Sequence, residues 1–493
     1  MTHRRARGRW LLAGALLVAA CGGGDAGSAA PVGGTDRLPT TATSTPTTTT
    51  SATSTTSTST TTPATTAAEA PTQAIGCGAP PPRAAPDPGR PRYRAAIGLD
   101  PDRAAVALTE QVTFTPDVAV DELVFRLWAN APRLRQVGTG IVVTSVSGPQ
   151  VASWSVSDPT TLRVELRQSV PAGSSITVDL AALLNVAGPV RDRVSRSGGS
   201  MRLGSVLPIL AWEPGQGWAR EPATSAFAES VMSPTADFVV DVGVPSGVEV
   251  LATGVEVSPG RWEATAVRDF ALTAGRFRRA AVTLELPDPV VVTVAVHDTV
   301  GESPDAYLSR IVEDLQLTAR TFGPYPWPSF SMAVTPDLRG GIEFPSHVMQ
   351  GPGSSGRTTP HEVAHQWFYG LVGNHQGRDP WMDEGVATYV EGRLEGTLDS
   401  MPAEAIPAAG QGRAGEPMTY WESRQDAYYR SVYVQTAVGL AALGPDELVD
   451  CALAHYLARH AHRIATPRDL LDSLAPFFPD VEAQLAPYGI GAP

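Results

Sequence analysis

The sequence has few cysteines, no long basic run and no apolar stretch long enough to cross a bilayer. Only three of its 493 residues are cysteines, which excludes a small fold held together by a dense disulfide framework. The formal net charge is -13, from 37 basic and 50 acidic residues. Because an acidic surface repels phosphate backbones and anionic headgroups, we expect neither nucleic acid nor an anionic lipid surface as the main partner. At about 150 residues per domain, this length allows two or three domains.

The longest apolar run near the N-terminus covers residues 10–20 and follows a basic region with four arginines. Such a run is too short to span about 30 Å of hydrocarbon, so residues 1–21 are predicted to be a signal segment. Val18-Ala19-Ala20-Cys21 resembles a bacterial lipobox. The resemblance implies a mature chain that begins at Cys21, carries lipid there and is held at the cell membrane outside the cytoplasm. The alternative is an ordinary secretory signal, which implies a secreted protein.

Residues 22–91 are rich in Thr, Ser, Pro and Ala and contain almost no large apolar side chains. Such a segment buries too little surface to offset the entropy lost on ordering, so we predict a disordered tether. Cys77 lies near its end and Cys451 near the C-terminus. Either a disulfide between them or two unpaired cysteines is compatible with the sequence.

Short runs of alternating apolar and polar residues recur from residue 92 to residue 289, as in Ile176-Thr177-Val178-Asp179-Leu180. A period of two with Gly, Pro, Asn and Asp between the runs indicates antiparallel β structure, in a sandwich or layered sheets. A last strand is expected at Val290–Val296 and a helix at Pro304–Phe322, after which helices dominate. The predicted fold class is therefore α+β and multidomain, with a β-rich, sandwich-like domain at 92–289 and a mainly helical domain at 290–493.

His361, Glu362 and His365 form an HExxH motif. In a helix, residues four positions apart lie on one face, so both imidazoles can reach one ion while Glu362 faces the same cavity. Imidazole nitrogen suits Zn²⁺, and a zinc ion with three protein ligands keeps a fourth position open for water. A third protein ligand is therefore required.

Glu384 is the candidate for this third ligand. It lies in the segment Trp381-Met382-Asp383-Glu384-Gly385, and eighteen residues separate it from His365. This spacing allows one helix to end, a loop to turn over residues 370–380 and a second helix to return antiparallel, which would aim Glu384 at the metal. We predict one Zn²⁺ held by His361, His365 and Glu384.

HExxH followed after eighteen residues by a glutamate in W-x-x-E-G resembles the gluzincins of the aminopeptidase N family. The resemblance implies a thermolysin-like catalytic domain, the three zinc ligands above and Glu362 as the general base. Many relatives append a large C-terminal helical-repeat domain, and we expect this chain to be a short form without it. Glu391, two turns after Glu384, either orients a zinc histidine or is a solvated carboxylate.

Two further segments match the family. Gly340-Gly341-Ile342-Glu343-Phe344 resembles its G-x-M-E-N strand, which implies that Gly340 and Gly341 contact a peptide substrate and that Glu343 binds its free α-amino group. Tyr433 matches the tyrosine of Tyr-x-Lys-Gly, which stabilises the oxyanion, and Tyr428 is a second candidate for a substrate-facing hydroxyl. Departures from the patterns are Phe344 for Asn, Gln435-Thr436 for Lys-Gly, and no counterpart in residues 193–208 of the family's second amino-group ligand.

The favoured function is a zinc metallopeptidase acting as an aminopeptidase on peptides or proteins, with Glu362 accepting the proton of the attacking water. One alternative is a zinc endopeptidase or other hydrolase that does not recognise an amino group. Another is a surface lipoprotein that keeps the peptidase fold for binding alone. No obligate protein partner is evident.

Overall fold

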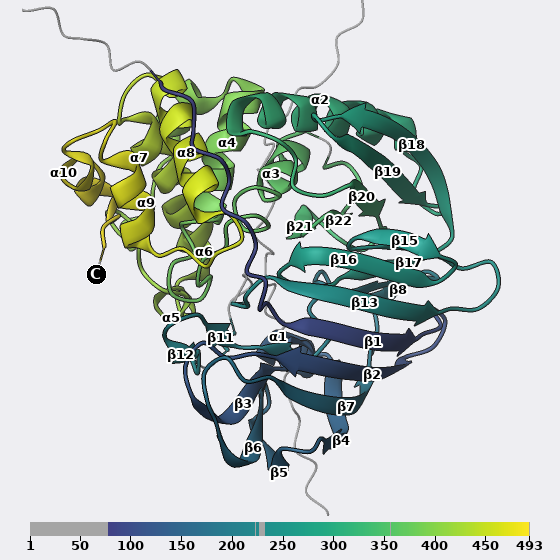
Figure 1. The fold of residues 1–493 in the computed structure, drawn as a ribbon. Coiled ribbons are helices and arrows are strands. Elements are labelled where there is room, and N and C mark those ends of the chain that lie inside the picture. The colour runs from purple at the N-terminus through teal and green to yellow at the C-terminus, as the bar shows by residue number, and fades with distance from the viewer. Residues whose placement is uncertain (1–76, 222, 226–231, 355, 493) are drawn as a thin grey trace, which may run out of the picture. The chain divides into compact units, whose positions relative to one another are not determined.

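Strands dominate the chain up to residue 297, and helices dominate it from residue 304 onward (Figure 1). The computed structural model describes residues 77–221, 223–225, 232–354 and 356–492, which belong to one compact unit. The order of the two parts confirms the predicted α+β class. The predicted signal segment, the lipid site at Cys21 and the tether up to residue 76 lie outside the described residues.

The largest sheet has seven strands in the order β15-β16-β13-β1-β2-β7-β4. Its neighbours are antiparallel except β1 and β13, which run parallel. Alternation of apolar and polar residues places alternate side chains in the core, as the exposed and buried pattern of β2 shows. The strands are β1 (Arg92–Gly98), β2 (Ala105–Phe114), β4 (Gly140–Ser147), β7 (Ile176–Asn185), β13 (Ala236–Gly243), β15 (Val255–Ser258) and β16 (Arg261–Val267).

Smaller sheets complete the β-rich part. One has the order β10-β3-β6-β5, one has the order β14-β17-β9-β8, and β11 pairs with β12. Their members are β3 (Val120–Arg126), β5 (Val151–Asp158), β6 (Thr161–Val170), β8 (Val194–Ser197), β9 (Ser200–Leu203), β10 (Ile209–Leu210), β11 (Trp212–Glu213), β12 (Gly217–Trp218), β14 (Glu249–Ala252) and β17 (Leu272–Gly275). Two short helical segments, η1 (Trp128–Asn130) and α1 (Pro132–Gln136), follow β3.

A five-stranded sheet with the order β18-β19-β20-β22-β21 belongs to the second part. Its strands are β18 (Phe277–Glu285), β19 (Pro289–His297), β20 (Ser329–Val334), β21 (Gly341–Phe344) and β22 (His347–Gln350). Because β18 pairs with β19 along its whole length, this sheet begins before the predicted domain boundary at residue 289. Strands β20 and β22 lie in a region that the sequence pattern predicts to be mainly helical. The pattern does not reveal them, because strands of six and four residues are too short to establish a period.

Helix α2 (Pro304–Phe322) has the predicted bounds, and Ser303 caps it by accepting a hydrogen bond from the amide of Asp305. Among the described residues, no helix is both long and apolar enough to cross a membrane. The remaining helical segments are α3 (Thr358–Ala364), α4 (Glu384–Glu395), η2 (Leu398–Ala403), α5 (Met418–Trp421), α6 (Gln425–Tyr428), the π-helix η3 (Tyr429–Val434), α7 (Gln435–Ala441), α8 (Asp446–His460), α9 (Pro467–Leu474), α10 (Val481–Leu485) and η4 (Ala486–Tyr488).

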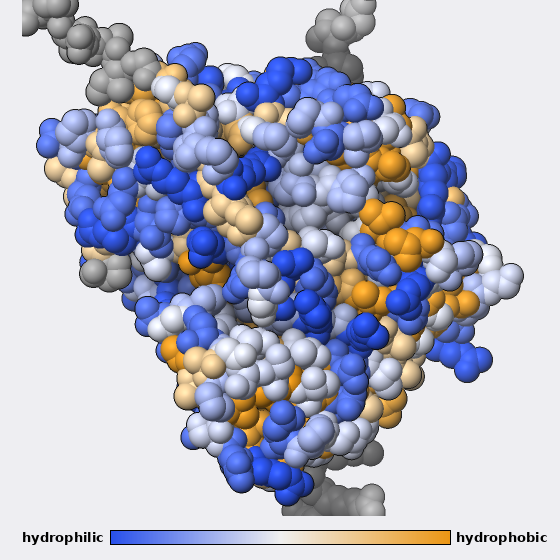
Figure 2. Space-filling view, viewed as in Figure 1, coloured by the Kyte–Doolittle hydropathy of each residue, from blue (hydrophilic) through white to orange (hydrophobic). Residues whose placement is uncertain are grey.

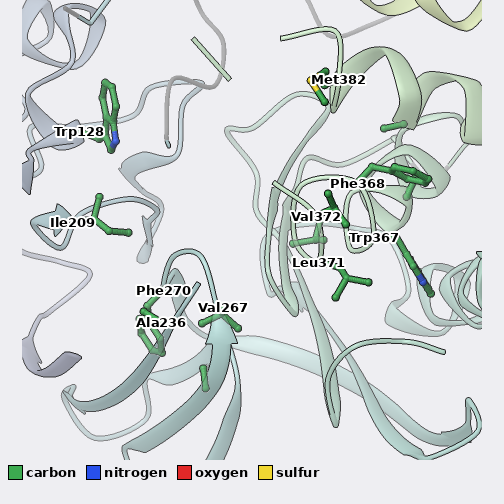
Figure 3. Close-up of a cluster of buried hydrophobic side chains, with 14 of the residues drawn as sticks. Trp128, Ile209, Ala236, Val267, Phe270, Trp367, Phe368, Leu371, Val372 and Met382 are labelled. Carbon is green, nitrogen blue, oxygen red and sulfur yellow. The ribbon is translucent and has the colours of Figure 1, made fainter. Parts of the chain in front are cut away.

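One hydrophobic cluster runs through both parts, so the β-rich and helical regions share a core. Figure 3 draws side chains of the β-rich part, such as Trp128 and Phe270, together with Trp367, Phe368 and Leu371 of the helical part. The face in Figure 2 is mostly hydrophilic, with small apolar patches between polar side chains. The two parts are therefore held as one body by apolar packing.

Residues 77–91, the end of the predicted tether, lie against the helical part before the chain enters β1. Cys77 forms a disulfide with Cys451 of α8, and the amide of Ala84 donates to the carbonyl of Ala458 over 2.9 Å. Arg90 then pairs with Asp237 of β13 over 2.7 Å. Contacts with the body thus begin at Cys77 rather than at the predicted boundary of residue 92, and of the two states that the sequence allows for these cysteines, the structure has the disulfide.

Candidate metal centre

Helices α3 and α4 bring the three predicted metal ligands together. His361 lies in α3, His365 is its C-cap, and Glu384 is the first residue of α4. The Nε2 atoms of the two histidines are 3.0 Å apart, and Oε2 of Glu384 lies 3.1 Å from His361 Nε2 and 3.3 Å from His365 Nε2. One donor atom from each residue lies within 4.8 Å of the others, so the three could hold a metal ion.

The local sequence explains why Glu384 points at α3. Asp383 is the N-cap of α4 and accepts a hydrogen bond from the amide of Glu384, which fixes the start of the helix beside the histidines. Gly385 follows because α7 approaches at this point: a Cβ atom there would overlap the side chain of Thr436. The glycine of W-x-x-E-G thus permits the close packing of α4 against α7.

The outer nitrogen of each imidazole has a polar neighbour. His361 Nδ1 lies 3.3 Å from Oε2 of Glu391, and Glu391 itself accepts a hydrogen bond from Arg357. His365 Nδ1 lies 3.0 Å from the carbonyl of Phe368, so it donates there and leaves its Nε2 lone pair for the centre. Of the two roles open to Glu391, the geometry favours orientation of His361.

Charge is unevenly distributed over the centre. Burial opposes ionisation of Glu384, but hydrogen bonds with His361 and His365 outweigh it and hold the pKa of this carboxyl well below its usual range. Burial, followed by the nearby Glu343, raises the pKa of Glu362 to about 8. Burial is also the main cause that raises the pKa of Glu343. The centre therefore combines an ionised ligand carboxylate with two acids for which ionisation is costly.

Glu362 and Glu343 face the centre from α3 and from the edge strand β21. Both are buried, and Oε2 of Glu362 and Oε1 of Glu343 have no hydrogen-bond partner among the described residues. Gly341 lies directly against Glu362, since a Cβ atom at this position would overlap the Glu362 side chain. Gly340 adopts a positive φ of 72°, which favours glycine. The Gly-Gly pair therefore lets β21 turn and pass close to Glu362.

Tyr433 lies in the π-helix η3, on the side of His361. The two rings stack with centroids 5.7 Å apart and planes 9° apart. Tyr428 packs edge-on against Tyr433, with centroids 5.6 Å apart. The π-helix widens the backbone turn between α6 and α7, a feature that is frequent at functional sites. The structure thus brings Tyr433 next to the ligands and Tyr428 behind it.

The departures from the family patterns have structural explanations. Phe344 is buried, and the end of its ring fills the space that a side chain at Gly204 of the β-rich part would need. Gln435 binds the backbone of a neighbouring loop, accepting from the amide of Gly412 and donating to the carbonyl of Gly410. Thr436 packs on α4 at Gly385. The residues that depart from the family patterns, Phe344, Gln435 and Thr436, therefore each contact another segment of the chain.

Sequence reasoning missed the residues that support the ligands from outside. Asp383 could have been found, because an aspartate directly before a predicted helix is an N-cap signal. Arg357 could not, since nothing in its spacing indicates a contact with Glu391, 34 residues away. The donor set itself fits zinc: two imidazole nitrogens and one carboxylate oxygen are ligands that Zn²⁺ favours, and three protein ligands leave a position for water.

No protein-family model matches the sequence. Aminopeptidase RNPEPL1 from Homo sapiens is 23% identical over 221 residues, which cover 36% of this chain and 29% of that protein. Aminopeptidase B from Homo sapiens is 24% identical over 238 residues, covering 41% and 36%. Leukotriene A-4 hydrolase from Xenopus laevis is 32% identical over 84 residues, covering 15% and 14%. The chain matches less than half the length of each of these curated relatives.

Solved structures of an M1 zinc metallopeptidase from Deinococcus radiodurans are similar over most of the chain. One is 18% identical with a TM-score of 0.58 and covers 83% of this chain and 96% of that one. A variant of the same enzyme bound to a Tyr-Ser-Ala substrate gives a TM-score of 0.61, covering 82% and 94%. The chain therefore has the fold of the M1 zinc metallopeptidases, which confirms the resemblance to the aminopeptidase N family at the level of fold.

Proposed function

We propose that this chain is a zinc-dependent aminopeptidase that hydrolyses the N-terminal peptide bond of peptides or proteins. The observation that carries the proposal is the convergence of donor atoms from His361, His365 and Glu384, with the buried carboxylate of Glu362 beside them. The aminopeptidases among its sequence relatives and the metallopeptidase fold support it.

One zinc ion held by these three side chains would supply Lewis acidity to the substrate carbonyl and lower the pKa of a water molecule. Glu362 accepts a proton from the attacking water through its unpartnered oxygen, and it then passes that proton to the departing amine. Glu391 and the carbonyl of Phe368 hold the two imidazoles so that their Nε2 atoms face inward.

Tyr433 donates its hydroxyl hydrogen bond to the carbonyl oxygen as negative charge develops there. Its place beside His361 supports this role, and the stacked ring limits its movement. One such donor typically lowers the barrier by about 3 kcal/mol. Tyr428 packs edge-on against Tyr433, and this position makes it the second candidate for a hydroxyl that contacts substrate.

Glu343 binds the α-ammonium group of the substrate, which fixes cleavage to the first peptide bond. Its unpartnered, buried oxygen supports this role, because a substrate cation would compensate a costly buried charge. Gly341 lets the edge strand β21 pass directly against Glu362, so a substrate backbone that lies along this edge comes close to Glu362. Gly340, with its positive φ, forms the turn that precedes this strand.

A pair of matched peptides tests the amino-group role. We expect the full chain to release the first residue of a free peptide and to leave the N-acetylated peptide intact, because acetylation removes the charge that Glu343 binds. A chelator should stop the reaction and added Zn²⁺ should restore it. Equal turnover of both peptides would replace the aminopeptidase by an endopeptidase. Absence of bound metal in the purified protein would favour the function of a binding lipoprotein.

We also propose an extracytoplasmic location, with lipid on Cys21 as the anchor. The disulfide between Cys77 and Cys451 supports this location, since disulfides persist in oxidising compartments. Full chain expressed in a bacterium should fractionate with membranes, and Cys21→Ser should release it. If Cys21→Ser leaves the protein on the membrane, the anchor is not at this cysteine.

A further inference from the structure

Residues 374–380 form a loop that reaches both the start of α4 and the β-rich part. The loop leads directly from the HExxH region into the segment that carries Glu384. It also contacts α5 through the amide of Met418, which donates to the carbonyl of Gly377. The β11–β12 hairpin borders the same region (Figure 1).

The inner side of this loop holds the N-cap of α4. Gln376 Nε2 donates to Oδ2 of Asp383 over 2.8 Å, and Asn374 Nδ2 donates to Oδ1 over 3.3 Å. Asn374 also closes the loop on itself by donating to the carbonyl of Asp379 over 2.9 Å. Asp383 accepts from the backbone amide of Glu384, so the loop contacts the first turn of the helix that carries this ligand.

The outer side of the loop is bound by two carboxylates of the β-rich part. Arg378 Nε donates to Oε1 of Glu221 over 2.7 Å, and its Nη1 donates to Oε2 of Glu213 over 3.1 Å. His375 Nε2 lies 3.4 Å from Glu221 and 3.6 Å from Glu213. One arginine thus bridges two acids that belong to the other part of the chain.

These acids are themselves fixed in place. Glu213 lies in β11, and the neighbouring Trp212 donates from Nε1 to Asp117 over 3.0 Å. The backbone carbonyl of Glu221 accepts from the buried Arg126 of β3. The side chain of Glu213 is 13% exposed, whereas those of Arg378 and Glu221 are 45% and 40% exposed, so water screens these ion pairs in part.

We propose that the β-rich part sets the affinity of the metal centre through this chain of contacts, with Arg378 and Gln376 as positioning residues for Glu384. Glu213 and Glu221 fix Arg378, the 374–380 loop transmits that position, and Gln376 holds the N-cap beside the ligand. This inference rests on the proposed zinc site. It assigns a role at that site to residues that contribute none of the three donor atoms.

The proposal predicts a loss of metal affinity that a structural role alone would not produce. Outer contacts of metal ligands are typically worth 10–100-fold in metal affinity. Gln376 acts on Glu384 through one residue, Asp383, so Gln376→Met should weaken zinc binding within this range. Arg378 acts through the loop, and Arg378→Met should weaken zinc binding by about 10-fold, the lower end of the range.

The measurement is the zinc dissociation constant of the full chain, obtained by competition with a chromogenic chelator. Arg90→Met is the matched control. Arg90, like Arg378, forms an ion pair between two segments of the chain, but its partner is Asp237 and the pair lies away from the 374–380 loop. We expect weaker zinc binding in Arg378→Met and wild-type binding in Arg90→Met, with similar melting temperatures for both variants in excess chelator. Equal zinc affinity in the two variants would overturn the proposal.

Two further variants keep the test decisive. Glu213→Gln preserves shape while it removes one charge from Arg378, and it should weaken zinc binding even if Arg378→Met fails to fold. Arg378→Lys should recover part of the affinity, since an ammonium can pair with one of the two acids but not bridge both in a fork. If wild-type protein binds no zinc, the proposed function fails. If wild-type protein binds zinc and Glu213→Gln binds it equally well, this inference alone fails.

Discussion

Buried acids are treated differently in the β-rich part and around the metal centre. In β2, Glu110 is fully enclosed, and neither carboxylate oxygen has a hydrogen-bond partner among the described residues. Around the centre, Glu384, Glu391 and Asp383 are equally buried and accept hydrogen bonds from neighbouring helices or loops. Beside them, Glu362 and Glu343 each leave one oxygen without a partner among the described residues, and both face the same centre. A lone buried acid only costs stability, whereas a group of acids that faces one point creates a binding site.

The largest effect is expected from the general base. Glu362→Gln keeps the size of the side chain and removes its ability to accept a proton. Hydrolysis should fall by about 10²–10⁴-fold, the scale of general base catalysis, while zinc content stays at the wild-type level. The assay is turnover of an aminoacyl fluorogenic substrate, together with metal analysis of the same sample.

Glu313→Gln on α2 is the matched control for this substitution. Its side chain is exposed and lies on a helix that carries no predicted site residue. The control should keep full activity. Near wild-type turnover in Glu362→Gln would remove this residue from the mechanism, and Glu362 would then be, like Glu110, a buried acid without a catalytic role.

A loss of about 10²–10³-fold in kcat is expected for Tyr433→Phe, with little change in KM, because the hydroxyl acts only as charge develops on the oxygen. Steady-state kinetics on the same substrate measure it. Tyr428→Phe provides the comparison within one aromatic cluster and should have a smaller effect. If Tyr428→Phe causes the greater loss of kcat, the two hydroxyls exchange their proposed roles.

The smallest effect is expected in the β-rich part, from Glu110→Gln. Burial raises the pKa of Glu110 well above its usual value, so the folded protein keeps a proton that the unfolded chain releases above about pH 4.3. From that pH up to the raised pKa, the free energy of unfolding therefore falls by about 1.4 kcal/mol for each unit of pH on account of this group. Glu110→Gln should lessen this fall in the free energy of unfolding, measured by denaturant unfolding from pH 5 upward.

Glu122→Gln is the control for the pH slope. Burial opposes ionisation of Glu122, but hydrogen bonds from Arg163 and Arg220 outweigh it and lower its pKa. Its stabilising contribution is present above its unfolded pKa and is lost only as pH falls toward its lowered value. The slope between pH 5 and pH 7 should stay the same in this variant. An unchanged slope in Glu110→Gln would mean that Glu110 is ionised in the folded protein.

The sequence was informative where the signal was local. The helical period from Pro304 to Phe322 predicted α2, and the alternation in Ile176–Leu180 predicted β structure where β7 of the large sheet lies. HExxH and the spacing to Glu384 predicted which side chains meet, because helix geometry and one short loop determine it. These features depend on few residues that are close along the chain.

Features that depend on distant contacts could not be predicted in this way. The packing of Phe344 on Gly204, 140 residues earlier in the chain, explains a departure from the family pattern only once the strands are placed. The same holds for Arg378 with Glu213 and for the start of contacts at Cys77. Sequence patterns report local preference and leave the choice of distant partners to tertiary packing.

The bond between Cys77 and Cys451 has a consequence for the integrity of the molecule. It joins two residues 374 positions apart, so nearly the whole body is closed into a covalent ring. A protease that cuts one backbone bond inside this ring opens it without freeing a fragment. A nicked molecule would still keep both of its parts in one piece until the bond is reduced.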